Sequence, residues 1–160
     1  MTIQFQSSVL FVKDIAASRH FYEKLLGQTV DIDFGPNVGF KGFSIWQIDH
    51  ASEMIFERPS EVAGQLGHKN FELYFETDNL ENVWSNLTTA HTPVVHPVRE
   101  HPWGQRAFRV HDPDGHIVEL GEPMPVVIHR LLGQGMTPAA VAKQTGMPLA
   151  IVEQVAATPV

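Results

Sequence analysis

Two successive stretches of the chain repeat the same order of expected elements, namely one strand, one helix and then three strands. In the first stretch an alternating segment precedes apolar residues at helical spacing, and Gly27 follows as a left-handed helix cap. In the second, Asp78-Asn79 offers a helix N-cap, and Asp112-Pro113-Asp114-Gly115 offers a turn before the last strand. Because internal repeats decide architecture, the sequence predicts a fold made of two copies of one unit.

The expected elements can be placed along the chain. In the first copy we expect strands at 3–12, 29–34, 38–41 and 43–48 and a helix at 15–26, and in the second copy strands at 71–75, 93–98, 107–110 and 117–121 and a helix over 80–87. We interpret residues 54–56 as a further short strand and 59–67 as a linker. Shifts of 65 and 72 residues put the copies in register and place Ser7 on Glu72 and Gln47 on Glu119.

Composition narrows the function classes. The net charge of −7 argues against nucleic acid or an anionic membrane as the main partner, and 43% hydrophobic residues suffice for a packed core. The absence of cysteine excludes disulfides, thiolate metal sites and cysteine nucleophiles. The chain has no glycine-rich nucleotide fingerprint, no Gly-x-Ser-x-Gly motif, no apolar run of membrane-spanning length and no secretory leader pattern. We therefore expect one cytoplasmic domain.

Two phrases of the sequence carry a family resemblance. They are Phe21-Tyr22-Glu23-Lys24-Leu25-Leu26-Gly27 and Asp112-Pro113-Asp114-Gly115-His116-Ile117-Val118-Glu119. With the repeated layout, they make residues 5–123 resemble the vicinal oxygen chelate superfamily, which includes glyoxalase I, bleomycin-resistance proteins and extradiol dioxygenases. The resemblance implies an α+β fold of paired βαβββ modules (about 1–58 and 68–124) that form a cup-shaped mixed sheet. It also implies a homodimer, and a small helical extension over 125–160 follows the paired modules.

The resemblance implies a site as well. Metal-using members hold the ion with one side chain from the first and last strand of each module, and these positions correspond here to Ser7, Gln47, Glu72 and Glu119. Glyoxalase I has His or Gln, Glu, His and Glu at these places. This chain keeps the last Glu, has an amide in place of the other acid, and has Ser and Glu at the remaining two places.

The alternation of side chains along the strands supports a polar cavity. Glu72 and Tyr74 point to one face of the expected strand 71–75, while its other residues are apolar. By the same rule Glu119 and Gln47 face the cavity, and Trp46 packs beneath a helix. The alternative is that one or two of these faces simply meet solvent.

Further candidates line the same expected cavity. Arg109 faces it and either grips an anionic substrate or pairs with Glu72 or Glu119. The substrate-binding candidates are Ser7, Phe11, Gln47, Tyr74, Trp103 and Arg109, with Trp103 in a loop suited to a mobile lid. Such mixed walls suit a small amphiphilic ligand.

The candidate residues are compatible with a metal site and with a metal-free cavity. Gln47, Glu72 and Glu119 offer oxygen ligands only, which favour hard ions such as Mg²⁺ or Mn²⁺ over Zn²⁺. The resemblance adds Fe and Ni to the candidate metals, and a cavity with no metal is the alternative. The histidines near the strands, including His96, are interpreted as solvated.

Three functions follow from these residues. In the first, a metal-assisted lyase, isomerase or dioxygenase uses Glu72 and Glu119 as catalytic proton carriers, with the metal as Lewis acid. In the second, the two carboxylates move protons without a metal. In the third, a metal-free resistance-type protein sequesters a drug or other small molecule and does no chemistry.

The last part of the chain predicts three short helices at 126–132, 139–145 and 148–157. Thr137-Pro138 is an N-cap followed by proline at the first helical position. The spacing resembles a helix-turn-helix, but Arg130 and Lys143 against Glu153 leave too little positive charge for a nucleic-acid partner. We expect the apolar faces to pack on the sheet edge, on a second subunit or over the cavity.

Overall fold

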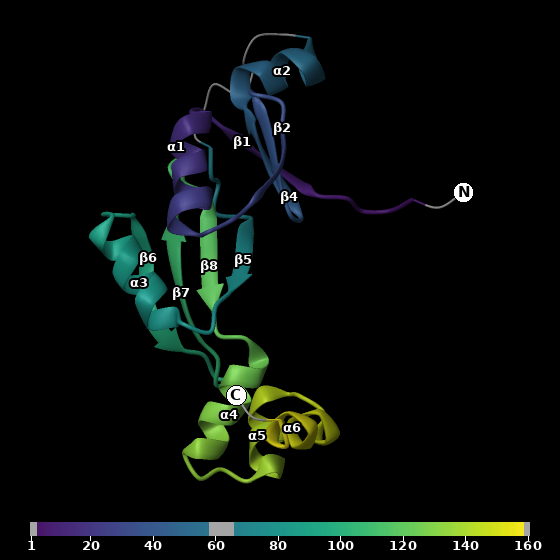
Figure 1. Cartoon of the computed structure of the whole chain (residues 1–160), viewed down its shortest axis with the longest axis vertical. Coiled ribbons are helices and arrows are strands. Elements are labelled where there is room, and N and C mark those ends of the chain that lie inside the picture. Colours follow the sequence, from purple (N-terminus) through teal and green to yellow (C-terminus); the bar gives the residue numbers. More distant parts are fainter. Residues whose placement is uncertain (1–2, 58–65, 159–160) are drawn as a thin grey trace. The chain divides into compact units, whose positions relative to one another are not determined.

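The computed structural model describes residues 3–57 and 66–158 and shows an α+β fold with two four-stranded sheets (Figure 1). The strands are β1 (Ser8–Val12), β2 (Val30–Asp33), β3 (Asn37–Phe40), β4 (Phe43–Gln47), β5 (Glu72–Glu76), β6 (Val94–Glu100), β7 (Arg106–His111) and β8 (Ile117–Gly121). The helices are α1 (Ile15–Arg19), η1 (His20–Leu25), α2 (Ile48–Phe56), α3 (Leu80–Thr89), α4 (Met124–Gly133), α5 (Pro138–Thr145) and α6 (Leu149–Ala156). Two compact units divide the chain, residues 1–71 with 111–117 and residues 72–110 with 118–160.

The two sheets have the same strand order, which confirms the predicted repeat. The order is β1-β4-β3-β2 in one and β5-β8-β7-β6 in the other, so the first strand of each module lies beside its last. In the first sheet β1 runs parallel to β4, and β3 is antiparallel to both β2 and β4. The fold is thus a pair of βαβββ modules, the first of which carries an additional helix.

The predicted helix over 15–26 is confirmed, with a change of winding inside it. Asp14 caps α1 by accepting hydrogen bonds from the backbone N–H groups of Ala16 and Ala17, at 2.8 and 3.1 Å. The helix continues as the π-helix η1, and Gly27 follows with a φ of 64°. The buried Tyr22 ring packs against Phe40 and Phe43 with ring centroids 6.0 and 5.1 Å away.

Two expectations for the first module are wrong. The first strand begins at Ser8 rather than at residue 3, and residues 54–56 belong to helix α2 rather than to a strand. The Gln47 side chain starts this helix by accepting a hydrogen bond from the backbone N–H of His50. One face of the helix is buried, at Ile48, Ala51 and Ser52. This burial at helical spacing decides the structure of residues 54–56, although their three apolar side chains in a row are typical of a strand. Residues 59–65 of the expected linker lie outside the described residues.

The turn at 112–115 is confirmed and organises the first unit. The buried Asp112 carboxylate accepts from the backbone N–H groups of Asp114 and His116 at 3.0 and 2.8 Å and from the Tyr22 hydroxyl at 2.8 Å. Burial, followed by the Asp112 charge, raises the pKa of Tyr22 far above its usual value, so Tyr22 remains a neutral donor. Within the first unit, the turn therefore holds helix η1 through the Tyr22 hydroxyl.

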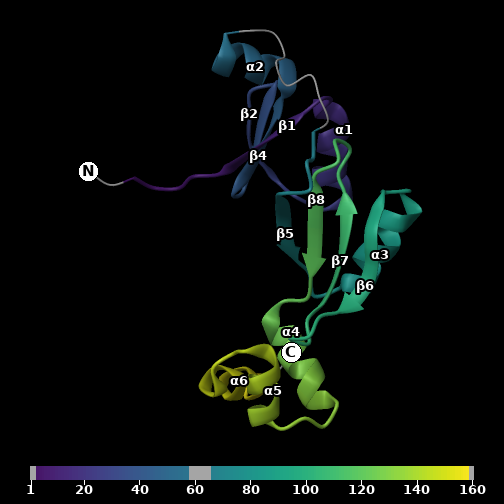
Figure 2. The same ribbon diagram turned by 180° about the vertical axis from the view of Figure 1, so that it is seen from behind.

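The second unit has a sheet core and a helical core. Helix α3 covers one face of its sheet (Figure 2), and Trp84 contacts Phe108 of β7 edge-on with ring centroids 5.0 Å apart. The three predicted C-terminal helices are present as α4, α5 and α6, with Thr137 as the N-cap of α5. They share an apolar core, formed by Val127, Ile128, Leu131, Val141 and Val152. In the described part of the chain no helix has the length and apolar character needed to cross a membrane.

The hydrogen bonds that the Asp112 carboxylate accepts give a stability prediction. Asp112→Ala leaves the Tyr22 hydroxyl and two backbone N–H groups without their acceptor, so we expect the free energy of unfolding to fall by roughly 3 kcal/mol. Tyr22→Phe, which removes only the hydroxyl, should cost about 1 kcal/mol. Urea denaturation followed by circular dichroism measures both. Equal losses in the two variants would show that the carboxylate does not hold the turn.

Candidate functional site

One face of the second sheet carries polar side chains, as the alternation predicts. Along β5 the side chains of Glu72, Tyr74 and Glu76 are exposed, whereas Leu73 and Phe75 between them are partly buried. On β7, Phe108 points toward α3, as its contact with Trp84 shows, so Arg109 lies on the opposite face. The open face of this sheet therefore collects ionisable groups from several strands.

Arg109 joins the two predicted carboxylates. Its Nε donates to Glu72 Oε2 at 2.8 Å, and its Nη2 donates to Glu72 Oε1 at 3.4 Å and also to Glu119 Oε2. Glu119 is only 6% exposed, whereas the Glu72 side chain is 40% exposed. The structure thus brings Glu72, Glu119 and Arg109 together and supports the pairing of Arg109 with both acids.

The two carboxyl groups have opposite pKa shifts. Burial raises the pKa of Glu119 above its ordinary value; the charge of Glu72 adds to this rise and Arg109 opposes it. The hydrogen bond from Arg109 lowers the pKa of Glu72. Glu72 therefore stays ionised, while Glu119 takes up and releases a proton closer to neutral pH than a free glutamate does.

His96 is a third partner of Arg109, and sequence reasoning missed it. The Nδ1 atom of His96 is 2.8 Å from the carbonyl oxygen of Pro97, and its Nε2 atom is 3.1 Å from Arg109 Nη1. A carbonyl only accepts, so Nδ1 carries the hydrogen and Nε2 accepts from Arg109. His96 is paired with Arg109 across β6 and β7, next to irregularities in the register that the sequence does not reveal.

A second network on this face fixes Tyr74. The Tyr74 hydroxyl donates to Glu76 Oε1 at 2.9 Å and accepts from Gln105 Nε2 at 2.8 Å. Trp103 Nε1 donates to Gln105 Oε1 at 3.0 Å, and the Trp103 ring stacks on His101 with centroids 4.4 Å apart. Burial, with the bond to Glu76, raises the pKa of Tyr74 to about 12. Gln105 is a second residue that the sequence did not single out as a candidate.

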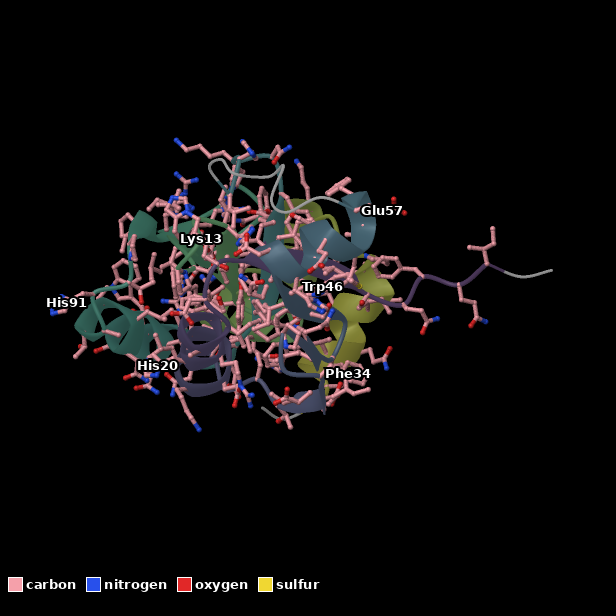
Figure 3. All side chains as sticks on the ribbon, turned by 90° about the horizontal axis from the view of Figure 1, so that it is seen from above. Lys13, His20, Phe34, Trp46, Glu57 and His91 are labelled. Carbon is pink, nitrogen blue, oxygen red and sulfur yellow. The ribbon has the colours of Figure 1, made fainter. Side chains whose placement is uncertain are left out.

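The face assignment of Gln47 and Trp46 in the first module is wrong. In the parallel pair, Phe11 is in register with Trp46 and Val12 with Gln47, so Trp46 of β4, labelled in Figure 3, shares the face of Phe11 according to this register. The two rings meet edge-on with centroids 6.5 Å apart. Gln47 instead lies on the side of the buried Val12, where its side chain caps α2 and donates to Asp49 Oδ2 at 3.1 Å. The shift of 72 residues, which placed Gln47 on Glu119, is therefore wrong for this strand, because it aligns residues that point to opposite faces of their sheets.

The other first-module candidates are Ser7 and Phe11, whose proposed role at the site stays a prediction. Ser7 directly precedes β1 and is exposed, and Phe11 is partly buried. The first unit contains three of the candidates, namely Ser7, Phe11 and Gln47. The second unit contains the other five, namely Glu72, Tyr74, Trp103, Arg109 and Glu119. The candidate site is therefore the polar sheet face of the second unit.

The donor set around Glu72 and Glu119 does not fit a divalent metal as it stands. The guanidinium of Arg109 hydrogen-bonds both carboxylates and also His96, so a permanent positive charge takes up the oxygen ligands that an ion would need. Within residues 3–57 and 66–158 no three His, Asp or Glu side chains are grouped to hold a metal. We therefore assign no chemical step to a metal.

Comparisons with known proteins agree with this fold. The model of the glyoxalase-like domain family matches residues 5–125. A protein of unknown function from Agrobacterium tumefaciens str. C58 is 35% identical and superposes with a TM-score of 0.71, over 77% of this chain and 96% of that one. No curated protein matches the chain.

Two structures of lower identity share the fold alone. A glyoxalase-related enzyme from Fulvimarina pelagi is 20% identical with a TM-score of 0.64, over 76% of this chain and 88% of that one. A lactoylglutathione lyase from Agrobacterium tumefaciens is 20% identical with a TM-score of 0.59, over 78% of this chain and 96% of that one. Because the family model spans most of the chain, from β1 to the start of α4, the protein belongs to the glyoxalase-like family of the vicinal oxygen chelate superfamily.

Proposed function

We propose that the protein is a small-molecule enzyme in which Glu119 transfers a proton to and from the bound substrate. The observation that carries this proposal is the pair of carboxyl groups that share one guanidinium while their pKa values shift in opposite directions. Pairs of acids that their environments separate in this way are typical of general acid–base sites. A protein that only sequesters a ligand does not need such a separation.

The chemistry that fits is the movement of a proton next to a carbonyl group, as in an isomerase or lyase. The Glu119 carboxylate takes a proton from the carbon beside the carbonyl; the C–H electrons form a C=C bond, and the carbonyl oxygen receives the negative charge. Protonated Glu119 then returns the proton to a neighbouring atom of the substrate. Glu72 and Arg109 stay ionised throughout and hold the Glu119 carboxyl in place.

The charges of the face indicate the kind of substrate. Glu72, Glu76 and Glu119 bring three carboxyl groups, and Arg109 is already bound to two of them. Neutral or cationic molecules are therefore favoured over highly charged anions. A small compound with two vicinal oxygens, such as a 2-hydroxy ketone or a 2-oxo aldehyde, is neutral and has an acidic C–H bond beside a carbonyl group. The family membership and the enzymes among the similar structures support the same class.

Glu119→Gln tests the assignment. This variant keeps the shape of the side chain but cannot take a proton, so we expect deuterium uptake from D₂O into the substrate to fall about 100- to 10,000-fold. Proton NMR of a panel of 2-hydroxy ketones and 2-oxo aldehydes measures the exchange. Glu53→Gln, at an exposed position of α2 outside the candidate site, is the control and should keep most of the activity.

Two results would contradict the proposal. One is full exchange by a folded Glu119→Gln protein, which would place the proton transfer elsewhere. The other is binding of panel compounds by the wild type with no exchange in any of them, which would favour the ligand-sequestering alternative.

The dependence on pH follows from the same contacts. The base form of Glu119 is active, so activity should fall as the pH drops through the raised pKa of this residue. Arg109 opposes that rise, hence Arg109→Met should move the acidic limb of the profile to higher pH. The pH dependence of kcat/KM measures the shift, and Lys143→Met on α5 is the control for loss of one positive charge. An unmoved or acid-shifted limb in Arg109→Met would contradict the coupling.

A further inference from the structure

The helical extension α4–α6 lies almost wholly beyond the part of the chain that matches the family, which ends at residue 125. It nevertheless contacts the loop between β6 and β7, residues 101–105, which we call the Trp103 loop. This loop supplies both side chains that orient Tyr74 on the candidate site. A chain of contacts therefore runs from the extension to the site within the second unit.

The first contact is made by Arg130 of α4. Its guanidinium donates to the backbone carbonyl of Gly104, to Glu100 Oε2 at 3.0 Å and to Glu122 Oε2 at 2.8 Å. Glu122 is 1% exposed. Burial alone would raise the pKa of Glu122, but the hydrogen bonds from Arg106 and Arg130 outweigh it and the pKa is lowered. This buried ionic cluster ties α4 to the Trp103 loop.

The second contact is the close approach of Gly104 to α4 and α5. Gly104 has a φ of +85°, and a Cβ atom there would lie 2.9 Å from Leu131 Cδ1 and 3.2 Å from Gln144 Nε2. A side chain at residue 104 would be strained by this positive φ, and the ends of the Leu131 and Gln144 side chains or the loop itself would have to shift to make room. The loop is held against the extension on two sides, by Arg130 and by this packing.

The loop in turn determines the orientation of Tyr74. An indole N–H only donates, so Trp103 requires the oxygen of the Gln105 amide to face it. The Gln105 NH₂ group then donates to Tyr74 and to the Glu122 carbonyl, both at 2.8 Å, and Tyr74 must donate to Glu76. Gly121 of β8 leaves room for the ring, since a Cβ atom there would lie 3.1 Å from Tyr74 Cε2.

We propose that the helical extension positions Tyr74 at the candidate site through Gly104 and Gln105, and that Tyr74 thereby sets which substrates fit. Tyr74 shares its sheet face with Glu72, two residues before it, and its ring is half exposed. A half-exposed aromatic ring held by two hydrogen bonds forms a rigid wall for a small ligand. The role in substrate choice rests on the proposed function, whereas the positioning of Tyr74 does not.

Tyrosine ring NMR tests the positioning directly. The chain has two tyrosines, so ¹³C labelling of the rings gives one signal for Tyr74 and one for Tyr22, which belongs to the first unit and serves as the internal reference. Gly104→Ala should shift the Tyr74 signal and leave that of Tyr22 unchanged. Gly135→Ala is the matched control, because Gly135 also has a positive φ, of 88°, but nothing lies within 4 Å of its added Cβ.

Kinetics tests the role in substrate choice. With a substrate found by deuterium exchange, Gly104→Ala and Gln105→Met should raise KM by about tenfold, the value of one hydrogen bond, with kcat and the pH profile of Glu119 nearly unchanged. If Gly104→Ala does not fold, Arg130→Lys makes the same test, since lysine keeps a cation beside Glu122 but lacks the donors to reach Gly104 as well.

Each outcome decides between positioning and mere stabilisation. An unshifted Tyr74 signal in folded Gly104→Ala or Arg130→Lys protein would overturn the proposal and leave the extension as a stabilising element. A shifted signal with an unchanged KM would overturn the role in substrate choice. A shifted signal in a protein whose Glu119→Gln variant keeps full exchange would support the positioning while refuting the proposed function.

Discussion

The candidate site depends on one cation, the guanidinium of Arg109. Two carboxyl groups on one sheet face repel each other, and one of them, Glu119, is almost completely removed from solvent. Burial and the neighbouring charge of Glu72 both favour the protonated form of Glu119, while Arg109 favours the ionised form of both acids. The balance of these three effects gives one permanently ionised acid and one that exchanges its proton. It also leaves no open set of oxygen ligands for a divalent ion.

Much of the fold was predictable because its signals are local. Helix caps at Asp78-Asn79 and Thr137, the turn at 112–115 and the period of two along β5 each depend on a few neighbouring residues. The errors arose where a non-local effect decides. Residues 54–56 are apolar like a strand, but the cap provided by Gln47 and the buried face of α2 make them helical. The faces of Trp46 and Gln47 depend on the register of β4 against β1, and an error of one residue exchanges them.

Part of the site was predictable because the alternation of side chains along a strand is also a local signal. Alternation alone put Glu72, Tyr74 and Arg109 on one face and Glu119 on the corresponding face of its strand, and the structure agrees. His96 and Gln105 were missed because their roles depend on an irregular strand register and on a loop conformation. The extent of burial, which raises the pKa of Glu119, is a property of packing and cannot be obtained from strand periodicity.

A direct titration of the two carboxyl groups tests the proposed role of Glu119. Carboxyl ¹³C NMR of glutamate-labelled protein, with Glu119→Gln and Glu72→Gln used to assign the signals, gives each pKa without any substrate. We expect Glu119 to titrate above and Glu72 below the ordinary glutamate value of about 4.3. If Glu119 titrated at or below that value in the folded protein, its carboxyl would be no more than a partner of Arg109 and would not be the proposed proton carrier.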